Sequence, residues 1–438
     1  MTVPAVAAGT ALLVLAAAVL CSSATGDEVP AVYVFGDSLV DAGNNDFLPL
    51  LVPRALPPNG VDLPSWVNHR TGRFTNGFNL ADIIGKVAQA FLSCPNKFAC
   101  QIELMANADA DADAAFLFLC SASECRRASS LLCSKIFCEV RMCAAQHVGF
   151  KLSPPAYLSL TPLSNLDDLL RGRVGANYAS GGSGILDITG IGTITLREQV
   201  QLFAETKHKI IRAGLVGREG LEDLLARSLF VISSGGNDFD AFDYGVPASE
   251  APEFIAGMVA TYIKHIKELY TLGARKLAIL DMVPVGCLPS QRAITANGDC
   301  DADGNKMAEM FNDGLRAEME KAVAASMPDL RYSIASLYNV LSDMIADPAL
   351  AGLHEVENAC CGGGKFNGEV NCIAGITFLC TDRDEYLFWD KVHGTQAAYR
   401  RAVQAFFNGT TRHAEPINLA QLVGSPSSTA PAAANSAI

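Results

Sequence analysis

The segment Ala31-Val32-Tyr33-Val34-Phe35 is a short apolar run of β-branched and aromatic residues, and Gly36-Asp37-Ser38 follows it directly. A run of this kind predicts a buried strand that ends in a tight turn. Residues 229–233 and 276–283 have the same character, and each of these runs also leads into a glycine-containing loop. We therefore expect three buried strands whose carboxyl ends are followed by glycine loops.

Helical patterns separate these apolar runs. Apolar residues recur at three- and four-residue spacing over residues 196–213, 252–272 and 305–327, which is the period of an amphipathic helix. Strands that alternate with helices predict a parallel sheet covered by helices on both faces. In such sheets the ligand site lies beyond the carboxyl ends of the strands, where the glycine loops fall.

The composition is that of a folded, acidic protein. Of the 438 residues, 50% are hydrophobic and 18% are charged, which is enough apolar material for a large core, and we expect one main domain. The 33 Lys and Arg residues against 46 Asp and Glu give a formal charge of -13. A charge of this sign repels phosphate backbones, so we exclude nucleic acid as a partner.

The N-terminus has the pattern of a signal peptide. Residues 2–20 form an Ala/Leu/Val run followed by small residues, and we interpret residues 1–26 as a signal peptide cleaved near residues 24–26. A transmembrane anchor is the alternative, because the run approaches the ~20 residues that span a bilayer. It has no basic stop-transfer flank, and no later segment is long enough to span. We expect a protein that is soluble in the secretory pathway or outside the cell.

Fourteen cysteines fit an oxidising compartment. One lies in the signal segment and seven lie between Cys94 and Cys143. The six in the C-terminal half are Cys287, Cys300, Cys360, Cys361, Cys372 and Cys380. Six cysteines allow 15 pairings, and the sequence does not choose among them. No Cys-x-x-Cys pair with His at zinc-finger spacing is present, so we expect no structural metal.

Two segments depart from the α/β pattern. Residues 87–147 are rich in Cys, Ala and Ser and have no clean period. We interpret them as an insertion, either a gene-model artefact such as a translated intron or a genuine one, and sequencing the transcript distinguishes the two. Residues 413–438 are predicted to be a C-terminal tail that is disordered at its end, where Ser, Ala and Pro predominate.

Asn408-Gly409-Thr410 is an N-glycosylation sequon, meaningful if the chain is exported.

Ser38 is the candidate nucleophile. A serine hydroxyl needs a base to take its proton, and the base needs a carboxylate to orient it. Ser38 follows the first predicted strand at an expected helix start, where backbone N–H groups favour a developing oxyanion. Taken alone, a serine at this place is more often a helix N-cap than a nucleophile.

Asp390 and His393 supply the other two groups of such a triad. An Asp three residues before a His can reach the Nδ1 side of the ring and fix the tautomer that leaves Nε2 free to accept a proton. For an isolated Asp-x-x-His, two polar residues on a solvated loop are the simpler interpretation. Residues 177–184 and 235–238 contain the glycines and the Asn237 amide that an oxyanion hole needs, although either stretch is also typical of a turn.

Taken together, these motifs resemble the plant GDSL esterase/lipase family of the SGNH hydrolase superfamily. The matching stretches are residues 35–39, 41–45, 73–77, 177–184, 235–238, 284–287, 360–362 and 388–393. The resemblance covers about residues 29–407 apart from the insertion. It implies a flavodoxin-like three-layer α/β/α sandwich with a mainly parallel sheet, formed by a hydrolase domain over residues 27–412.

The resemblance also implies a role for each matching residue. Ser38 is the nucleophile, His393 the general base and Asp390 its orienting partner. The backbone N–H of Ser38, a glycine taken here as Gly182, and the side chain of Asn237 form the oxyanion hole. Many members have proline after the catalytic histidine, whereas Gly394 stands here, and we expect a looser turn around the base.

The implied activity is hydrolysis of carboxylic esters, in lipids or in acylated cell-wall or secondary-metabolite substrates, through an acyl-Ser38 intermediate. No cofactor or metal is required, and the expected partner is a small acyl ester. An acyltransferase of the same fold and a catalytically inactive secreted ligand-binding protein are the alternatives. The expected location is extracellular, in the apoplast or cell wall. Neither the acyl chain length nor the oligomeric state can be predicted from the sequence.

Overall fold

The computed structural model describes residues 29–49, 51–64, 71–92, 101–103, 117–119, 153–162, 164–239 and 248–424. The expected signal peptide, most of the expected insertion and the end of the C-terminal tail lie outside the described residues. Within the expected insertion, β2 (Gln101–Glu103) and β3 (Leu117–Leu119) form an antiparallel pair.

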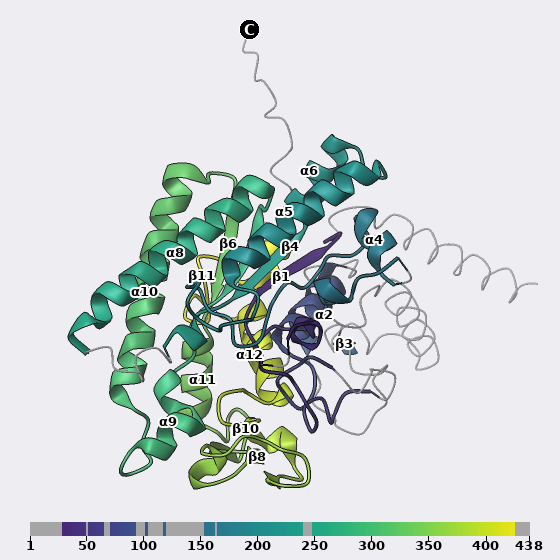
Figure 1. The fold of residues 1–438 in the computed structure, drawn as a ribbon. Helices are drawn as coiled ribbons and strands as arrows, with labels where there is room; N and C mark the ends of the chain where they lie inside the picture. Colours follow the sequence, from purple (N-terminus) through teal and green to yellow (C-terminus); the bar gives the residue numbers. More distant parts are fainter. Residues whose placement is uncertain are drawn as a thin grey trace, which may run out of the picture.

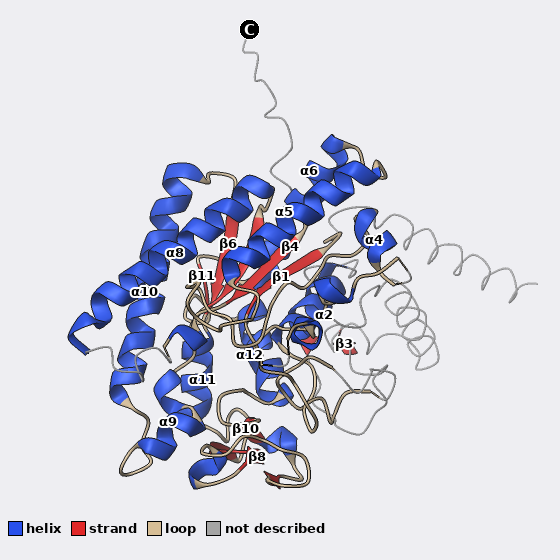
Figure 2. Ribbon diagram, viewed as in Figure 1, coloured by secondary structure: helices blue, strands red, loops and turns tan. Residues whose placement is uncertain are grey.

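The central sheet has five strands in the order β1-β4-β5-β6-β11. They are β1 (Val32–Gly36), β4 (Leu229–Ser233), β5 (Lys276–Leu280), β6 (Arg331–Ala335) and β11 (Ala414–Glu415). The first four are parallel, with Gly36 opposite Ser233 and Ser233 opposite Leu280, and β11 runs antiparallel to β6. The predicted mainly parallel α/β sheet is therefore confirmed (Figure 2).

Helices cover both faces of this sheet and complete the three layers (Figure 1). The helices on one face are α5 (Leu196–Ala213), α6 (Arg218–Arg227), α8 (Ala251–Leu272) and α10 (Ala302–Ser326), with the short α4 (Leu166–Leu170) beside α5. Those on the other face are α2 (Leu80–Leu92), α11 (Leu337–Ala346), α12 (Gln396–Asn408) and α13 (Leu419–Val423). None of the helices in the described residues is both long and apolar enough to cross a membrane.

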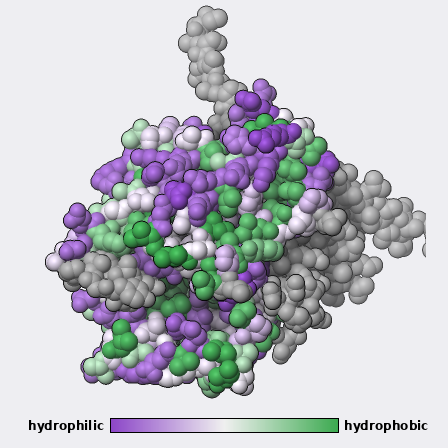
Figure 3. Space-filling model, viewed as in Figure 1, coloured by the Kyte–Doolittle hydropathy of each residue, from purple (hydrophilic) through white to green (hydrophobic). Residues whose placement is uncertain are grey.

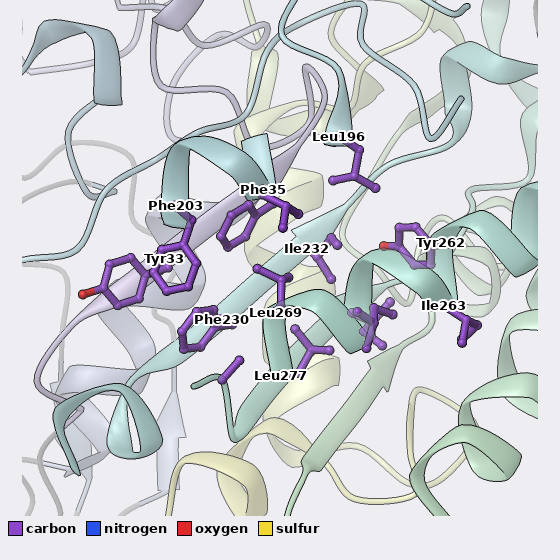
Figure 4. Packing of buried hydrophobic residues seen from close by; sticks show 14 of the residues in the cluster. Tyr33, Phe35, Leu196, Phe203, Phe230, Ile232, Tyr262, Ile263, Leu269 and Leu277 are labelled. Carbon is purple, nitrogen blue, oxygen red and sulfur yellow. The ribbon is translucent and has the colours of Figure 1, made fainter. Parts of the chain in front are cut away.

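Side-chain alternation along β1 explains why both faces are covered. Tyr33 and Phe35 pack into the cluster of α5 and α8, whereas Val32 and Val34 pack into the cluster of α2 and α12, because successive strand residues point to opposite faces. Figure 4 shows Tyr33 and Phe35 beside Phe203 of α5 and Phe230 of β4. The Tyr33 and Phe203 rings lie 5.0 Å apart. A strand buried on both faces has to be apolar throughout, as this one is.

Capping residues set the helix boundaries. Helix α5 begins at a capping box in which Thr195 accepts from the Glu198 N–H. Helix α10 begins three residues before the predicted 305 because the Asp301 side chain accepts the Gly304 N–H. Thr395 caps α12 in the same way through the Ala398 N–H, so the residue two positions after His393 is a helix N-cap.

A disulfide-linked region lies below the sheet in the view of Figure 1. It contains α9 (Pro289–Ile294), the parallel pair β7 (Glu355–Ala359) and β10 (Tyr386–Phe388), and the antiparallel pair β8 (Cys361–Gly362) and β9 (Phe378–Leu379). Its disulfides are Cys287–Cys300, Cys360–Cys380 and Cys361–Cys372. All six C-terminal cysteines are therefore paired. Trp389, which precedes the Asp390–His393 turn, is fully buried among four of them.

Two expected boundaries differ from the structure. The folded part continues past residue 412, because β11 pairs with β6 and the buried Leu419, Leu422 and Val423 of α13 pack into the core. The expected tail from residue 413 is thus wrong for its first part. Helix α2 runs to Leu92, and its buried Val87 belongs to the same core, so the insertion does not begin at Val87.

Candidate active site

Ser38 lies in a turn directly after β1. A Cβ at Gly36 would lie 1.8 Å from the Ser233 carbonyl oxygen, so only glycine lets β1 end so close to β4. The Asp41 N–H donates to the Asp37 carbonyl at 3.0 Å, closing a single helical turn around Ser38. The expected helix does not form there, and Ser38 is not an N-cap.

His393 and Asp390 meet Ser38 from the other end of the chain. The Nε2 atom of His393 lies 2.8 Å from the Ser38 Oγ. The Nδ1 atom of the same ring lies 2.9 Å from each carboxylate oxygen of Asp390. The three side chains therefore form one continuous hydrogen-bonded chain across 355 residues of sequence.

The surroundings of Asp390 keep its carboxylate ionised. Burial alone would raise its pKa, but the charge and hydrogen bond of His393, with the N–H groups of Val392 and His393, lower the pKa below its ordinary value. Both N–H groups donate to Oδ1, at 3.0 and 2.9 Å. An ionised Asp390 accepts the Nδ1 proton, which leaves Nε2 as the acceptor facing Ser38.

The turn that carries His393 is held at several backbone atoms. The Trp389 N–H donates to the His393 carbonyl at 2.8 Å. The Gly394 N–H donates to the Tyr399 hydroxyl at 2.9 Å, and the Gly394 carbonyl accepts from Thr75 Oγ1 at 2.9 Å. The looser turn expected from Gly394 is therefore not what the structure shows: both peptide groups of Gly394 are hydrogen-bonded.

The loop before α2 supports the same turn. The Phe74 ring lies 5.5 Å from the His393 ring, and the Gln396 N–H donates to Asn76 Oδ1 at 2.8 Å. Two hydrogen bonds between Arg73 and Asp82 anchor this loop at 2.6 and 2.9 Å. Burial opposes the charge on Asp82, yet Arg73 outweighs it and lowers the pKa of Asp82. This loop belongs to the matching stretch 73–77, for which the sequence had given no role.

The glycine-rich loop after residue 177 supplies the candidate oxyanion donors. Within the described residues, the N–H groups of Ser38, Gly182 and Gly184 donate to no protein acceptor. By contrast, the Gly181 N–H is bound to Asp41 Oδ2 at 2.9 Å and the Ser183 N–H to the Ser180 carbonyl at 3.0 Å. Gly182 has φ of 85°, which favours glycine. Its neighbours on both sides are thus excluded as donors.

Asn237 lies in a short 3-10 helix (Gly236–Asp238) that follows β4. Its side-chain nitrogen donates to the Ser183 carbonyl at 2.9 Å, so one N–H fixes the amide to the loop of Gly182. A primary amide has two N–H donors, and the second remains for a ligand.

A buried polar network beneath these donors escaped the sequence reasoning. Asn44 Nδ2 donates to the carbonyls of Asn177 and Ala179, each at 2.8 Å. Asn45 Nδ2 donates to the Gly181 carbonyl at 2.7 Å. Buried amides with several partners fix backbone geometry. The stretch 41–45 had been noticed for its resemblance alone, and its signal is a cluster of Asp and Asn between two apolar segments.

A second buried carboxylate lies next to the nucleophile. Burial raises the pKa of Asp37 to about 7, against the lowering effects of the Leu39 N–H and of His393. The Leu39 N–H donates to Asp37 Oδ1 at 3.1 Å.

Among the described residues, no group of three or more His, Cys, Asp or Glu side chains is placed to hold a metal ion.

The sequence is similar to one described protein family and to several plant enzymes. The family described as GDSL-like Lipase/Acylhydrolase matches residues 144–406. The GDSL esterase/lipase At5g55050 of Arabidopsis thaliana is 30% identical over 413 residues, covering 92% of each chain. The Arabidopsis GDSL esterase/lipase At3g50400 is 30% identical over 91% of this chain and 93% of its own length. The Arabidopsis GDSL esterase/lipase LTL1 is 29% identical over 89% of each chain. The chain belongs to the GDSL lipase/acylhydrolase family and is a hydrolase of ester bonds.

Proposed function

We propose that this protein hydrolyses carboxylic esters through an acyl intermediate on Ser38. The observation that carries the proposal is the 2.8 Å contact between Ser38 Oγ and His393 Nε2, with Asp390 bound to the opposite nitrogen of the ring. This arrangement matches the requirement of an activated nucleophile: a base within hydrogen-bond reach that is itself oriented by a third group.

The first half of the reaction forms the acyl-enzyme. Ser38 Oγ attacks the ester carbonyl carbon while His393 Nε2 takes the hydroxyl proton, and the resulting imidazolium is stabilised by Asp390. The negative charge on the carbonyl oxygen is held by the N–H groups of Ser38 and Gly182 and by the Asn237 amide. The carbon–oxygen bond to the alcohol then breaks, and the alcohol leaves with the proton from His393.

The second half releases the acid. Water gives a proton to His393 Nε2 and attacks the acyl carbon, and collapse of this second intermediate returns the proton to Ser38 Oγ. An alcohol or sugar hydroxyl in place of water would transfer the acyl group instead. Product analysis in the presence of hydroxyl acceptors therefore measures how hydrolysis and transfer divide.

We place this activity outside the cell. The N-terminal signal pattern and the three disulfides in the described residues support an oxidising, secretory route. Asn408 is exposed at the end of α12, so its sequon is accessible to glycosylation. The apoplast or cell wall is the proposed destination.

Ser38→Ala tests the proposal, and Ser326→Ala at the end of α10 is the matched control. The first variant is expected to lose hydrolysis of a soluble chromogenic acyl ester and labelling by a fluorophosphonate, whereas the control keeps both. Activity that survives in Ser38→Ala would refute the mechanism. A wild-type protein that the probe does not label would favour an inactive binding protein.

A further inference from the structure

Five large apolar side chains are exposed on two loops beside the candidate oxyanion hole. In the first loop, Phe47, Leu51 and Leu56 are 57%, 96% and 55% exposed, and in the second, Ile188 and Ile191 are 77% and 93% exposed. We call these five residues the apolar rim. Figure 3 shows hydrophobic atoms among the loops below helix α5, while the helices above present mainly hydrophilic surface. Contiguous exposed apolar side chains mark interaction sites more often than isolated ones do.

Both loops approach Gly182 closely, and they also approach each other. A Cβ at Gly182 would lie 2.9 Å from the Pro53 ring, and one at Gly190 would lie 2.1 Å from the Gly182 carbonyl oxygen. A Cβ at Gly192 would lie 3.4 Å from a methyl of Val52. Leu51 and Ile191 immediately precede Val52 and Gly192 in sequence. The two most exposed members of the rim therefore lie on adjoining backbone segments, next to the proposed oxyanion donor.

Four charged residues lie on the loops that carry the rim, Asp46, Arg54, Asp62 and Asp187, and two of them are held in ion pairs. Asp187 pairs with Arg197 at 2.8 Å, and Asp62 pairs with Arg383 at 2.7 Å. Arg54 donates to the Leu48 carbonyl at 2.7 Å. The chain has a formal charge of -13, and this surface has no cluster of basic residues that would attract an anionic partner. An uncharged partner is not repelled by the net negative charge. The charge distribution fits an uncharged surface.

We propose that the apolar rim inserts into a neutral lipid surface and thereby presents acyl esters to Ser38. The inference rests on the proposed ester hydrolase function and deepens it by naming how the substrate is presented. Leu51 and Ile191, at 96% and 93% exposure, protrude from the protein instead of lining a groove. Protruding aliphatic side chains gain from burial in a fluid apolar phase, which needs no complementary shape.

The test compares Leu51→Ser/Ile191→Ser with the control Leu350→Ser. Leu350 is a leucine of similar exposure, 87%, on the turn after α11 and outside both rim loops. The substrates are an emulsion of trioleoylglycerol and soluble 4-nitrophenyl acetate. We expect the double variant to lose emulsion hydrolysis by about tenfold for each side chain, a factor that corresponds to about 1.4 kcal/mol. Hydrolysis of the soluble ester is expected to stay within twofold of wild type.

A binding measurement separates this inference from the proposed function. Flotation with trioleoylglycerol droplets is measured for Ser38→Ala with and without the two rim substitutions, so that turnover plays no part. Flotation that depends on Leu51 and Ile191 supports the rim even if no ester is hydrolysed. Equal flotation of both proteins, or an equal loss of emulsion activity in Leu350→Ser, overturns it.

Discussion

Tyr399→Phe is the substitution that tests most directly how the catalytic turn is held. The Gly394 N–H donates to the Tyr399 hydroxyl at 2.9 Å, and Tyr399 is only 3% exposed. Phenylalanine keeps the ring and its packing but removes the acceptor, so the perturbation is confined to one buried hydrogen bond. Burial, together with the nearby Asp390 and Asp37 carboxylates, raises the pKa of Tyr399 far above its usual value. The hydroxyl therefore stays neutral at any pH used in an assay.

The expected magnitude follows from the orphaned N–H. A buried donor left without a partner costs about 1–3 kcal/mol, and here the cost falls on the residue next to His393. We expect the free energy of unfolding to fall by about 1–2 kcal/mol. If the same energy loosens the position of His393, kcat falls by about tenfold while KM changes little, because 1.36 kcal/mol in the barrier is a factor of ten.

The assay measures urea unfolding together with kcat and KM for a soluble ester. Tyr338→Phe is the matched control, since its hydroxyl bonds Glu309 at 2.7 Å on the surface and its loss is expected to change stability by less than about 0.5 kcal/mol. Unchanged stability and kcat in Tyr399→Phe would refute the reasoning. Stability that falls while kcat stays the same would show that the hydroxyl supports the fold and not the position of the base.

Two other predictions concern stability. The pKa of Asp37 is raised by burial to about 7 from 3.8, so the folded protein binds this proton more tightly and its stability falls as the pH rises from about 4 to about 7. The free energy of unfolding at pH 5 is expected to exceed that at pH 8 by on the order of 2–3 kcal/mol because of this group. The Asp37→Asn variant should lack this difference. If the variant keeps the same dependence of stability on pH, Asp37 is not the group responsible. Replacing Cys361 and Cys372 by serine removes a disulfide with a sequence separation of 11. We expect the free energy of unfolding to fall by about 2–4 kcal/mol, measured as a lower urea midpoint. An unchanged midpoint would show that the packing around Trp389 is enough to hold this region.

Strands and long helices could be predicted from the sequence because their apolar patterns are long and regular. The runs at 229–233 and 276–283 contain β4 and β5, and the starts of α8 and α10 lie within three positions of the predicted ones. The short β11 and α13, of 2 and 5 residues, have no period to detect. They are stabilised by burial against β6 and the core, which no local sequence pattern reveals, and for that reason the sequence predicts a tail there.

The sequence predicts the catalytic residues of the site, but it does not predict the hydrogen-bond network that holds them in place. Ser38, Asp390, His393 and Asn237 stand in short motifs whose chemistry is local, whereas the network of Asp41, Asn44 and Asn45 works through backbone atoms more than 130 residues away. The choice of Gly182 among neighbouring glycines could not be argued from spacing. The bonds already made by the Gly181 and Ser183 N–H groups exclude those two donors, but within the described residues the N–H groups of both Gly182 and Gly184 are unbonded, and Gly182 stays a prediction.

Gly394 shows why a single position is a poor guide to rigidity. Its φ is not in the left-handed region, so glycine is not required there by backbone conformation. A Cβ at this position would lie 2.7 Å from the Tyr399 ring, and proline would also lack the N–H that the hydroxyl accepts. Gly394 and Tyr399 are therefore one unit: the tyrosine excludes a side chain and supplies the restraint that a proline ring would have given. Accordingly, Gly394→Ala should be less destabilising in a Tyr399→Ala background than in wild type. Additive effects on stability in that double-mutant cycle would show that the two residues are not coupled.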